Sequence, residues 1–316
     1  MMSMTLHKII HVAAAVLIRP DGTFLLAQRP SDKAYAGYWE FPGGKIEAGE
    51  TALQALYREL DEELGIAVTR AYPWLNRVFT YPHATVHLHF FRVFEWHGEA
   101  YGREGQRLSW QAPDAVHVTP LLPANLPILR ALSLPTRYAI SNAAELGTAE
   151  FLLHLERALQ NGLRLVQVRE QHLSPENYLA FTQTVVTLAH RFNATVLVNG
   201  DAELAKAAAA DGVHYTGKQL LECVARPDFA WCSASCHTVQ ELQHAGALGF
   251  DFALLSPVLP TLSHPGAAHL GWGKFADMIA QTTLPVYALG GLVAEDLATA
   301  QQHGAHGIAL LRQAWL

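Results

Sequence analysis

The residues best placed to do chemistry are carboxylates gathered near position 60, in the string GKIEAGETALQALYRELDEELGI that begins at Gly44. Residues 51–64 follow a helical pattern, and Gly65 is a typical helix stop. Four leucines form one apolar stripe along this helix: Leu53, Leu56, Leu60 and Leu64. The pattern therefore predicts a helix that packs its leucines inward and carries its acidic residues at the C-terminal end.

Four of the last six residues of this predicted helix are acidic: Glu59, Asp61, Glu62 and Glu63. A helix C-terminus favours cations, and like charges at i,i+4 cost about 0.2–0.5 kcal/mol per pair. Glu59, Glu62 and Glu63 stand at i, i+3 and i+4, so their oxygens can share one face. Oxygen ligands at this density suit Mg²⁺, with Mn²⁺ as an alternative. A solvated acidic helix end would explain the last turn alone, but not the residues before it.

The spacing of the whole string resembles the Nudix box. Its fixed positions are Gly44, Glu50, Arg58, Glu59, Leu60, Glu62, Glu63, Gly65 and Ile66. The resemblance implies Mg²⁺-dependent cleavage of a diphosphate linked to another group. It implies that the metal ligands are Glu59, Glu62 and Glu63, with the Gly43 carbonyl. Glu50 would assist by hydrogen bonding, Arg58 would orient the carboxylates, and Glu59 is a candidate base that the box alone does not identify.

The surroundings of the box resemble the MutT-like 8-oxo-dGTP diphosphatases over residues 7–133. The matching pieces are LLAQRP, WEFPGGKIEAGET, FEWHGEAYGREGQ and LPANLPILRAL. This resemblance implies that Glu104 belongs to the metal side, Asn125 reads the base, Arg29 lies near the nucleotide and Phe41 forms a pocket wall. An amide suits base recognition because it both donates and accepts hydrogen bonds. The structural alternatives are that Asn125 is only a turn residue, Glu104 a loop charge and Arg29 a surface charge. One departure from the MutT-like pattern is Ala84, which stands where a basic residue that helps to hold the base is expected.

Length and composition predict two domains. The chain has 316 residues, half of them hydrophobic, and the proline-rich segment 117–136 predicts domains at 1–133 and 136–316. A net charge of −6 argues against a nucleic-acid polymer as partner, and no apolar run suggests a membrane span. Three cysteines without a CxxC pair exclude a disulfide scaffold, and the cytoplasm is the expected location. Oligomeric state is left open.

The two halves differ in their pattern of elements. The first half predicts an α+β fold with strands at 9–19, 23–28, 77–81, 85–95 and 108–111 and helices at 51–64 and 124–132. The Nudix resemblance implies an α/β/α sandwich with a mixed sheet. The second half alternates strands and helices, which predicts a parallel (β/α)₈ barrel. Its expected strands are 137–141, 164–169, 195–199, 212–216, 230–235, 251–256, 285–289 and 307–311.

The second half resembles the thiamine phosphate synthase and TenI superfamily. The carrying motifs are VQVRE, LVNGDAELAKAAAADGVHYT, SASCHTVQEL, FALLSPVLPTLSHPG, PVYALGGL and GAHGIALL. Barrel enzymes place reactive groups where strands end. This selects Arg169, Asn199, His214, His237 and Ser256, with a phosphate position at Gly290 and Gly291. A thiazole phosphate or thiamine-related molecule is the ligand that the resemblance implies.

This half departs from the synthase pattern at four places. Gln171 replaces a lysine, Gly200 and Gln219 replace metal-binding aspartates, and a threonine–lysine motif has become Ser263-His264. A diphosphate leaving group would be poorly neutralised without these residues, so synthase activity is not expected. The barrel is then a metal-free thiazole tautomerase with His237 as acid or base, or a non-catalytic binding module in which His237 is a loop histidine.

Two functions remain for the whole chain. The first is an 8-oxo-dGTP diphosphatase that protects the nucleotide pool, and hence replication fidelity and DNA repair. The alternative is a hydrolase of thiamine-pathway diphosphates, which the fusion to a TenI-like barrel suggests.

Overall fold

The computed structural model describes residues 9–82, 84–261, 266 and 268–316. The contacts divide the chain into two compact units, one ending at Ser133 and the other beginning at Leu134. Each unit has its own hydrophobic core. Among the described residues, no helix is long and apolar enough to span a membrane.

The first unit is built on two small sheets. One has the order β4-β1-β6-β5, in which β1 and β6 run parallel and the other neighbours antiparallel. Its strands are β1 (Ile9–Leu17), β4 (Gly43–Lys45), β5 (Ala67–Tyr81) and β6 (Ala84–His97). The other has the order β3-β2-β7, with β2 (Phe24–Gln28), β3 (Trp39–Glu40) and β7 (Leu108–Gln111). The larger sheet is therefore mixed.

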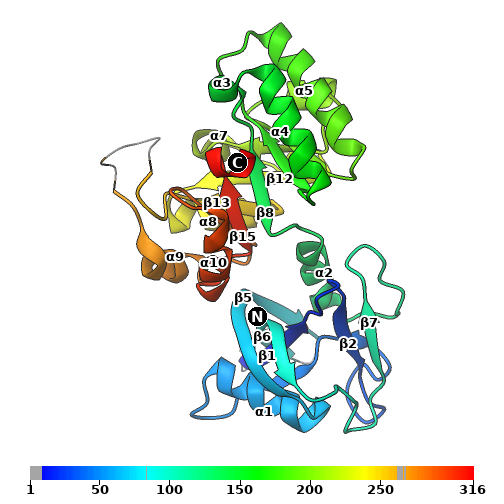
Figure 1. Ribbon diagram of the computed structural model, residues 1–316. Helices are drawn as coiled ribbons and strands as arrows, with labels where there is room; N and C mark the ends of the chain where they lie inside the picture. Colours follow the sequence, from blue (N-terminus) through cyan, green and yellow to red (C-terminus); the bar gives the residue numbers. More distant parts are fainter. Residues whose placement is uncertain (1–8, 83, 262–265, 267) are drawn as a thin grey trace. The chain divides into compact units, whose positions relative to one another are not determined.

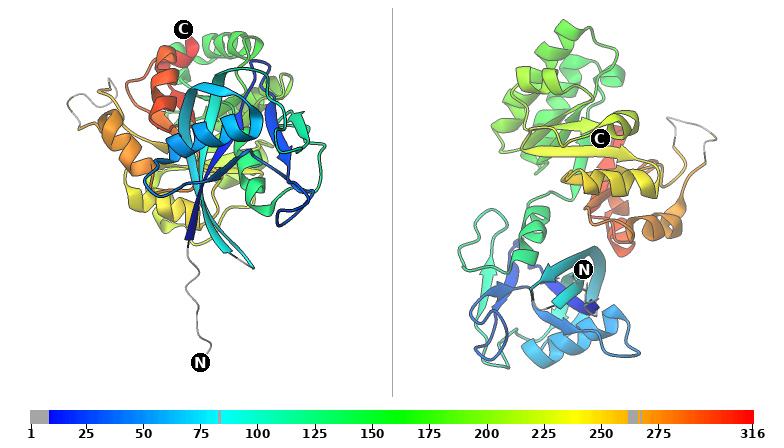
Figure 2. Two further views of the ribbon diagram at one scale, coloured as in Figure 1. Left: turned by 90° about the horizontal axis from the view of Figure 1, so that it is seen from below. Right: turned by 180° about the vertical axis from the view of Figure 1, so that it is seen from behind.

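Alternation along β1 sends side chains to two cores, because successive residues of a strand face opposite sides. Ala13 and Ala15 pack with helix α1 (Ala52–Leu64), whereas Ala14 and Val16 pack with helix α2 (Leu126–Leu132). Figures 1 and 2 show α1 lying along one face of the β1, β5 and β6 strands. The first unit is therefore an α/β/α sandwich.

Helix α1 begins and ends as its sequence predicts. Thr51 accepts a hydrogen bond from the Gln54 amide in a capping box, and Gly65 closes the helix with φ of 68°. The apolar stripe is shorter than expected, since Leu53 is 37% exposed while Leu56, Leu60 and Leu64 are buried. Ala55 takes the inward position in the first turn. Burial therefore secures the end of the helix that carries the carboxylates.

The second unit is a closed barrel of eight parallel strands, as predicted. The strands are β8 (Arg137–Ile140), β9 (Leu165–Val168), β10 (Thr195–Asn199), β11 (Gly212–Tyr215), β12 (Trp231–Cys236), β13 (Phe252–Leu255), β14 (Val286–Leu289) and β15 (Gly307–Leu310). The helices are α3 (Ala143–Leu146), α4 (Thr148–Gln160), α5 (Pro175–His190), α6 (Ala202–Ala207), α7 (Gly217–Glu222), α8 (Val239–Ala247), α9 (Gly271–Ile279) and α10 (Leu297–Gln302). Short 3₁₀ turns cover η1 (Pro123–Asn125), η2 (Ala294–Asp296) and η3 (Arg312–Trp315).

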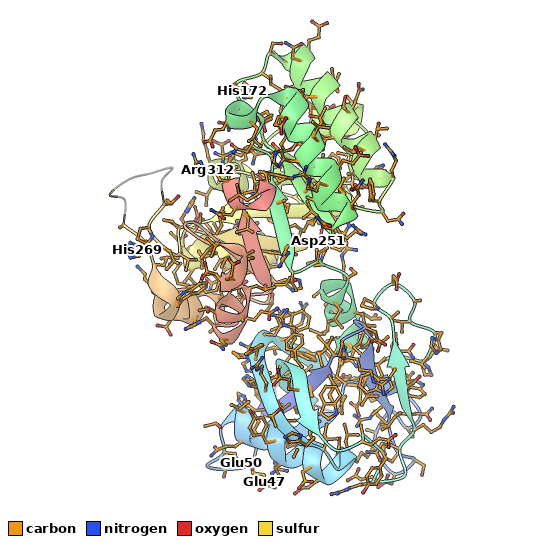
Figure 3. The ribbon with its side chains drawn as sticks, viewed as in Figure 1. Glu47, Glu50, His172, Asp251, His269 and Arg312 are labelled. Atoms are coloured by element: carbon orange, nitrogen blue, oxygen red, sulfur yellow. The ribbon has the colours of Figure 1, made fainter. Side chains whose placement is uncertain are left out.

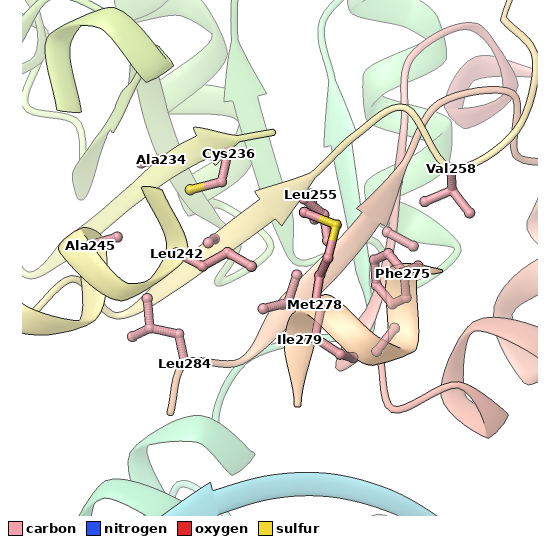
Figure 4. Close-up of a cluster of buried hydrophobic side chains, with 14 of the residues drawn as sticks. Ala234, Cys236, Leu242, Ala245, Leu255, Val258, Phe275, Met278, Ile279 and Leu284 are labelled. Carbon is pink, nitrogen blue, oxygen red and sulfur yellow. The ribbon is translucent and has the colours of Figure 1, made fainter. Parts of the chain in front are cut away.

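Two layers of apolar side chains hold the barrel together. Inside it, Tyr138, Phe252 and Tyr287 pack with ring centroids 5.3–5.8 Å apart. Between strands and outer helices lies a larger cluster that includes Cys236, Leu255 and Phe275 (Figure 4). Cys232 and Cys236 are completely buried, and burial raises the pKa of the Cys232 thiol to about 11. These cysteines are core residues.

The differences from the predicted strands lie in the first unit. Strand β5 begins ten residues earlier than expected, because Pro73 and irregular pairing near Val68 and Arg70 obscure the alternation. The short strands β3 and β4 were not predicted, since the sequence between them reads as a proline–glycine turn. Their pairing partners on β1 and β2 are distant in sequence, so only the tertiary structure reveals them.

Candidate functional site

The last turns of α1 hold the acidic residues in one ionic network centred on Arg58. Its guanidinium donates to Glu50 from Nε at 2.8 Å and from Nη2 at 2.9 Å, and to Glu59 from Nη1 at 2.8 Å. A weaker contact of 3.2 Å reaches Glu62. The bond from Arg58 holds the pKa of Glu50 down at about 2. Arg58 therefore orients three carboxylates, and Figure 3 places Glu50 beside α1.

Two glycines allow the backbone to approach these carboxylates. A Cβ atom at Gly44 would lie 2.1 Å from the carboxyl carbon of Glu59, so only glycine fits there without moving that side chain. The amide of Gly43 donates to Glu63 at 3.3 Å. Strand β4 thus forms one wall of the acidic site.

Glu63 is the most constrained carboxylate of the cluster. Its side chain is 14% exposed, and burial raises its pKa to about 7, while Lys33 and the Gly43 amide act in the opposite direction. The Nζ atom of Lys33 lies 3.6 Å from Glu63 and 2.8 Å from Glu104. Glu104 therefore reaches the cluster through Lys33. No motif had singled out Lys33, which lies in the loop between β2 and β3.

The donor set fits a hard divalent cation. Glu59 and Glu63 are part-buried carboxylates that Arg58 and Lys33 compensate only in part. Glu62 is more exposed, at 59%, and Glu104 lies at 46%. Oxygen ligands alone, several of them charged, are what Mg²⁺ and Mn²⁺ prefer. The residues that would hold such an ion are Glu59, Glu62, Glu63, Glu104 and the Gly43 carbonyl.

A cavity of about 650 Å³ opens beside this cluster. Six of the residues proposed from the sequence line it: Arg29, Phe41, Gly43, Glu59, Glu63 and Asn125. The other four lie outside its lining: Glu50, Arg58 and Glu62 connect to it through the Arg58 network, and Glu104 connects through Lys33. The volume is in the range of small-ligand pockets.

Asn125 and Phe41 form the interior of this cavity. Asn125 is 4% exposed, and its Nδ2 atom is buried with no hydrogen-bond partner. An unpaired buried amide costs free energy, which a ligand with a facing acceptor would recover. The Phe41 ring packs on Phe24 and edge-on to Phe90, at 5.8 Å in both cases. The cavity therefore offers an apolar wall and one free donor.

Arg29 is engaged within the protein. It pairs with Glu40 at 2.5 Å and donates from Nε to the Ala34 carbonyl at 2.6 Å. Glu40, Tyr35 and Tyr81 also line the cavity and were missed by sequence reasoning. Burial raises the pKa of Tyr81 to about 12, so its hydroxyl stays protonated and can donate a hydrogen bond. These residues come from separate loops and strands, and no local pattern connects them.

The second unit has a cavity of about 670 Å³ where its strands end. Of the seven barrel residues proposed from the sequence, all but His214 line it: Arg169, Asn199, His237, Ser256, Gly290 and Gly291. Nδ1 of His237 lies 2.9 Å from the Ser256 carbonyl, so that nitrogen carries the proton and Nε2 is left as an acceptor. A Cβ atom at Gly291 would lie 2.3 Å from the Pro260 carbonyl oxygen, and φ is 71°. Only glycine fits this turn.

The departures from the synthase pattern have visible consequences. Gln219 forms a capping box with Thr216 at the start of α7, and its Nε2 atom donates to the Gly200 carbonyl at 2.5 Å. Its side chain is therefore occupied by hydrogen bonds within the protein. Gln171 is exposed. Ser263 and His264 lie outside the described residues. No carboxylate lines the barrel cavity among the residues that the structure describes.

A buried histidine lies beneath the barrel cavity. His214 is completely buried, with Nδ1 at 2.7 Å from the Ser233 hydroxyl and Nε2 at 2.8 Å from the Ser235 hydroxyl. Burial, and to a lesser extent the charge of Arg169, lowers its pKa to about 3. His214 is therefore neutral at pH 7, and Ser235 connects it to the cavity.

Comparison with known proteins assigns each unit to a family. Residues 9–132 match the model of the NUDIX domain, and residues 137–314 match the model described as thiamine monophosphate synthase. The chain therefore belongs to both families: it joins a Nudix hydrolase domain to a domain of the thiamine phosphate synthase and TenI family. The resemblances drawn from the sequence are confirmed.

Individual relatives match one unit each. A CTP pyrophosphohydrolase of Escherichia coli is 44% identical and covers 39% of this chain and 91% of its own length. An 8-oxo-dGTP diphosphatase of Haemophilus influenzae is 42% identical and covers 40% of this chain and 92% of its own. A putative thiamine-phosphate synthase of Aquifex aeolicus is 34% identical and covers 56% of this chain and 96% of its own length.

Proposed function

We propose that the first unit, residues 1–133, is a Mg²⁺-dependent diphosphatase that converts 8-oxo-dGTP to 8-oxo-dGMP and pyrophosphate. The observation that carries the proposal is one cavity lined both by the carboxylates Glu59 and Glu63 and by the buried, unpaired amide of Asn125. Such a cavity can hold the phosphates of a nucleotide and its base together. Relatives of the Nudix unit named for nucleoside triphosphates support the substrate class.

The roles of this chain's residues follow from their contacts. A divalent cation held by the carboxylates would neutralise phosphate charge and activate water for attack. Arg58 holds Glu50, Glu59 and Glu62 in place. A carboxylate such as Glu59 takes the proton of the attacking water, and Lys33 supplies a positive charge for phosphate oxygens. Breaking the bond between the α- and β-phosphates then releases the monophosphate and pyrophosphate.

Base recognition depends on Asn125 and the aromatic wall. The free Nδ2 donor of Asn125 pairs with a base acceptor, and Phe41 covers an apolar face. Cytidine triphosphate is the competing substrate, because the E. coli relative is named for it. Thiamine diphosphate is the competitor that the second unit suggests.

The test is Mg²⁺-dependent hydrolysis of 8-oxo-dGTP, dGTP, CTP and thiamine diphosphate by the full-length protein, measured as kcat/KM. We expect 8-oxo-dGTP to have the highest kcat/KM. Asn125→Ala should lower that kcat/KM by about 10-fold and change the value for thiamine diphosphate little, since leaving a buried polar group without its partner costs about 1–3 kcal/mol. An equal fall in kcat/KM for all substrates would contradict the proposal that Asn125 recognises the base. Preference for CTP or for thiamine diphosphate would reassign the substrate.

For the second unit, residues 136–316, we propose binding of a thiazole phosphate or related anion, without synthase activity. Arg169 and the amides after β14 would hold the phosphate, and Nε2 of His237 would move a proton if the unit is a tautomerase. His237→Ala should then abolish thiazole isomerisation. If the wild-type protein shows no isomerisation but binds the ligand, the unit is a binding module. We place both activities in the cytoplasm.

A further inference from the structure

Three histidines lie together on neighbouring strands of the first unit. His11 on β1 pairs directly with His87 on β6, and His89 lies two residues further along β6. Their ligand-capable ring nitrogens all lie within 4.8 Å of one another. No motif of the Nudix box includes any of them.

The geometry of the three rings is close to that of a metal site. Nδ1 of His11 and Nε2 of His89 are 3.1 Å apart. Tetrahedral zinc with Zn–N bonds of about 2.0–2.1 Å separates two nitrogen ligands by roughly 3.3 Å. The ring centroids of His87 and His89 lie 4.3 Å apart, and those of His11 and His87 lie 5.1 Å apart. Small side-chain rotations are enough to point all three nitrogens at one ion.

The three histidines lie on the opposite face of β1 and β6 from the cavity that Glu59 and Asn125 line. Ile10 and Val12 of β1, and Val86 and Leu88 of β6, line that cavity. The histidines occupy the alternating positions, which point to the other side of the sheet. The two groups of side chains are therefore separated by the backbone of the sheet.

The surroundings leave room for an ion. His11 is exposed, and His87 and His89 are half-buried. Across the β5–β6 pairing, His87 faces Val78, which is 58% exposed, and His89 faces Asn76. Solvent can therefore reach the three nitrogens, and an ion held there would keep a position for water, as in three-histidine zinc sites.

We propose that His11, His87 and His89 form a site for a transition-metal ion of the Zn²⁺ class, separate from the carboxylate cluster. Neutral imidazole nitrogens favour Zn²⁺, Ni²⁺, Cu²⁺ and Co²⁺, whereas Mg²⁺ favours oxygen ligands. The ion cross-links β1 to β6. The competing interpretation is a stack of hydrogen-bonded imidazoles that binds nothing.

The test is calorimetric titration of the full-length protein with Zn²⁺ in excess Mg²⁺, which occupies the carboxylate cluster. We expect uptake of about one Zn²⁺ per chain, and a loss of affinity of about 100-fold or more in His11→Ala and in His87→Ala. His97→Ala, at the exposed end of β6, is the matched control and should titrate as the wild type does. Glu59→Gln should also retain the uptake.

Two further measurements separate binding from folding. His11 is exposed, so His11→Ala should unfold at the wild-type temperature without metal, while the rise in Tm on adding Zn²⁺ should disappear. Co²⁺ in place of Zn²⁺ should give the strong visible absorption of a nitrogen-ligated, low-coordinate ion, and the variants should lose it. Identical titrations of the wild type, His11→Ala and His87→Ala would overturn the proposal, as would a wild type that takes up no Zn²⁺.

Discussion

The two units hold cavities of nearly equal volume, about 650 and 670 Å³, with different charged linings. The first is lined by four glutamates, Glu40, Glu47, Glu59 and Glu63, together with the cations Arg29, Lys33 and Lys45. The second is lined by Arg169 and Arg312 and, among its described residues, by no carboxylate. Figure 3 shows Glu47 and Arg312 in their respective units.

This contrast shows two ways of receiving an anionic ligand. In the first cavity the proposed chemistry depends on a divalent cation, because phosphate can approach the carboxylates closely only when their charge is neutralised. A cavity with arginine and backbone amides attracts phosphate directly. Arg312 is already paired with Glu145, with Nε at 2.9 Å, which leaves Arg169 as the less compensated cation.

The largest effect is expected at Glu59. Glu59→Gln removes the negative charge of a proposed metal ligand that also pairs with Arg58, so kcat for nucleotide hydrolysis should fall by about 10³-fold. Chelation of Mg²⁺ should have a similar effect, while ligand binding by the barrel is unchanged. Glu99→Gln, on an exposed loop of the same unit, is the control. A Glu59→Gln enzyme with near-normal kcat would remove the metal-centred account of the first cavity.

Gly44→Ala tests the close approach of β4 to α1. The new Cβ would overlap the Glu59 carboxyl group, and a displacement of about 1 Å can cost about 10²-fold in rate. Because the clash involves the end of a flexible side chain, Tm should change little. Gly273→Ala, where nothing lies within 4 Å, should leave hydrolysis unchanged. A lower Tm with an unchanged kcat would mean that Gly44 is needed for folding and not for the geometry of the carboxylates.

Arg169→Gln tests the second cavity. A charged hydrogen bond is worth about 1.5–3 kcal/mol, so the affinity for inorganic phosphate should fall by roughly 10- to 100-fold in calorimetric titration. Neither Mg²⁺ nor its removal should alter the wild-type affinity. Arg137→Gln, at the start of β8 and so at the opposite end of the barrel, is the control. A requirement for Mg²⁺ would make the two cavities alike.

Because His214 is buried in its neutral form, we expect the free energy of unfolding of the barrel to fall at acid pH. Its pKa is about 3 in the folded protein and 6.5 in the unfolded chain, so the unfolded chain binds the proton first and stability falls as pH drops below 6.5. By pH 5 the loss should be about 2 kcal/mol. Chemical denaturation at pH 7 and pH 5 measures it, and His214→Asn should flatten the difference. An unchanged slope in the variant would assign the acid loss to other groups.

The barrel was the more predictable fold. Its eight strands and most of its helices follow from regular alternation, because each βα unit repeats the same local pattern. The first unit was less predictable: β3, β4 and the first half of β5 depend on long-range pairing, and Pro73 hides the strand in which it lies. Local propensity could not reveal them.

The candidate sites divide in a similar way. Glu59, Glu62 and Glu63 could be found from spacing alone, because a helix places i, i+3 and i+4 on one face. Lys33, Glu40 and Tyr81 could not, because they join the first cavity from loops and strands with no shared periodicity. The histidine cluster was equally hidden, since it depends on the parallel register of β1 and β6.

The amino-acid sequence by itself determined the two families and the helix that carries the carboxylates, because each is a matter of residue type at short spacing. Only the tertiary structure decided which side chains share a cavity, that Arg29 is paired with Glu40, and that Asn125 keeps an unpaired buried amide. These depend on which distant segments pack together, and burial then sets the charge and hydrogen-bonding capacity of each group.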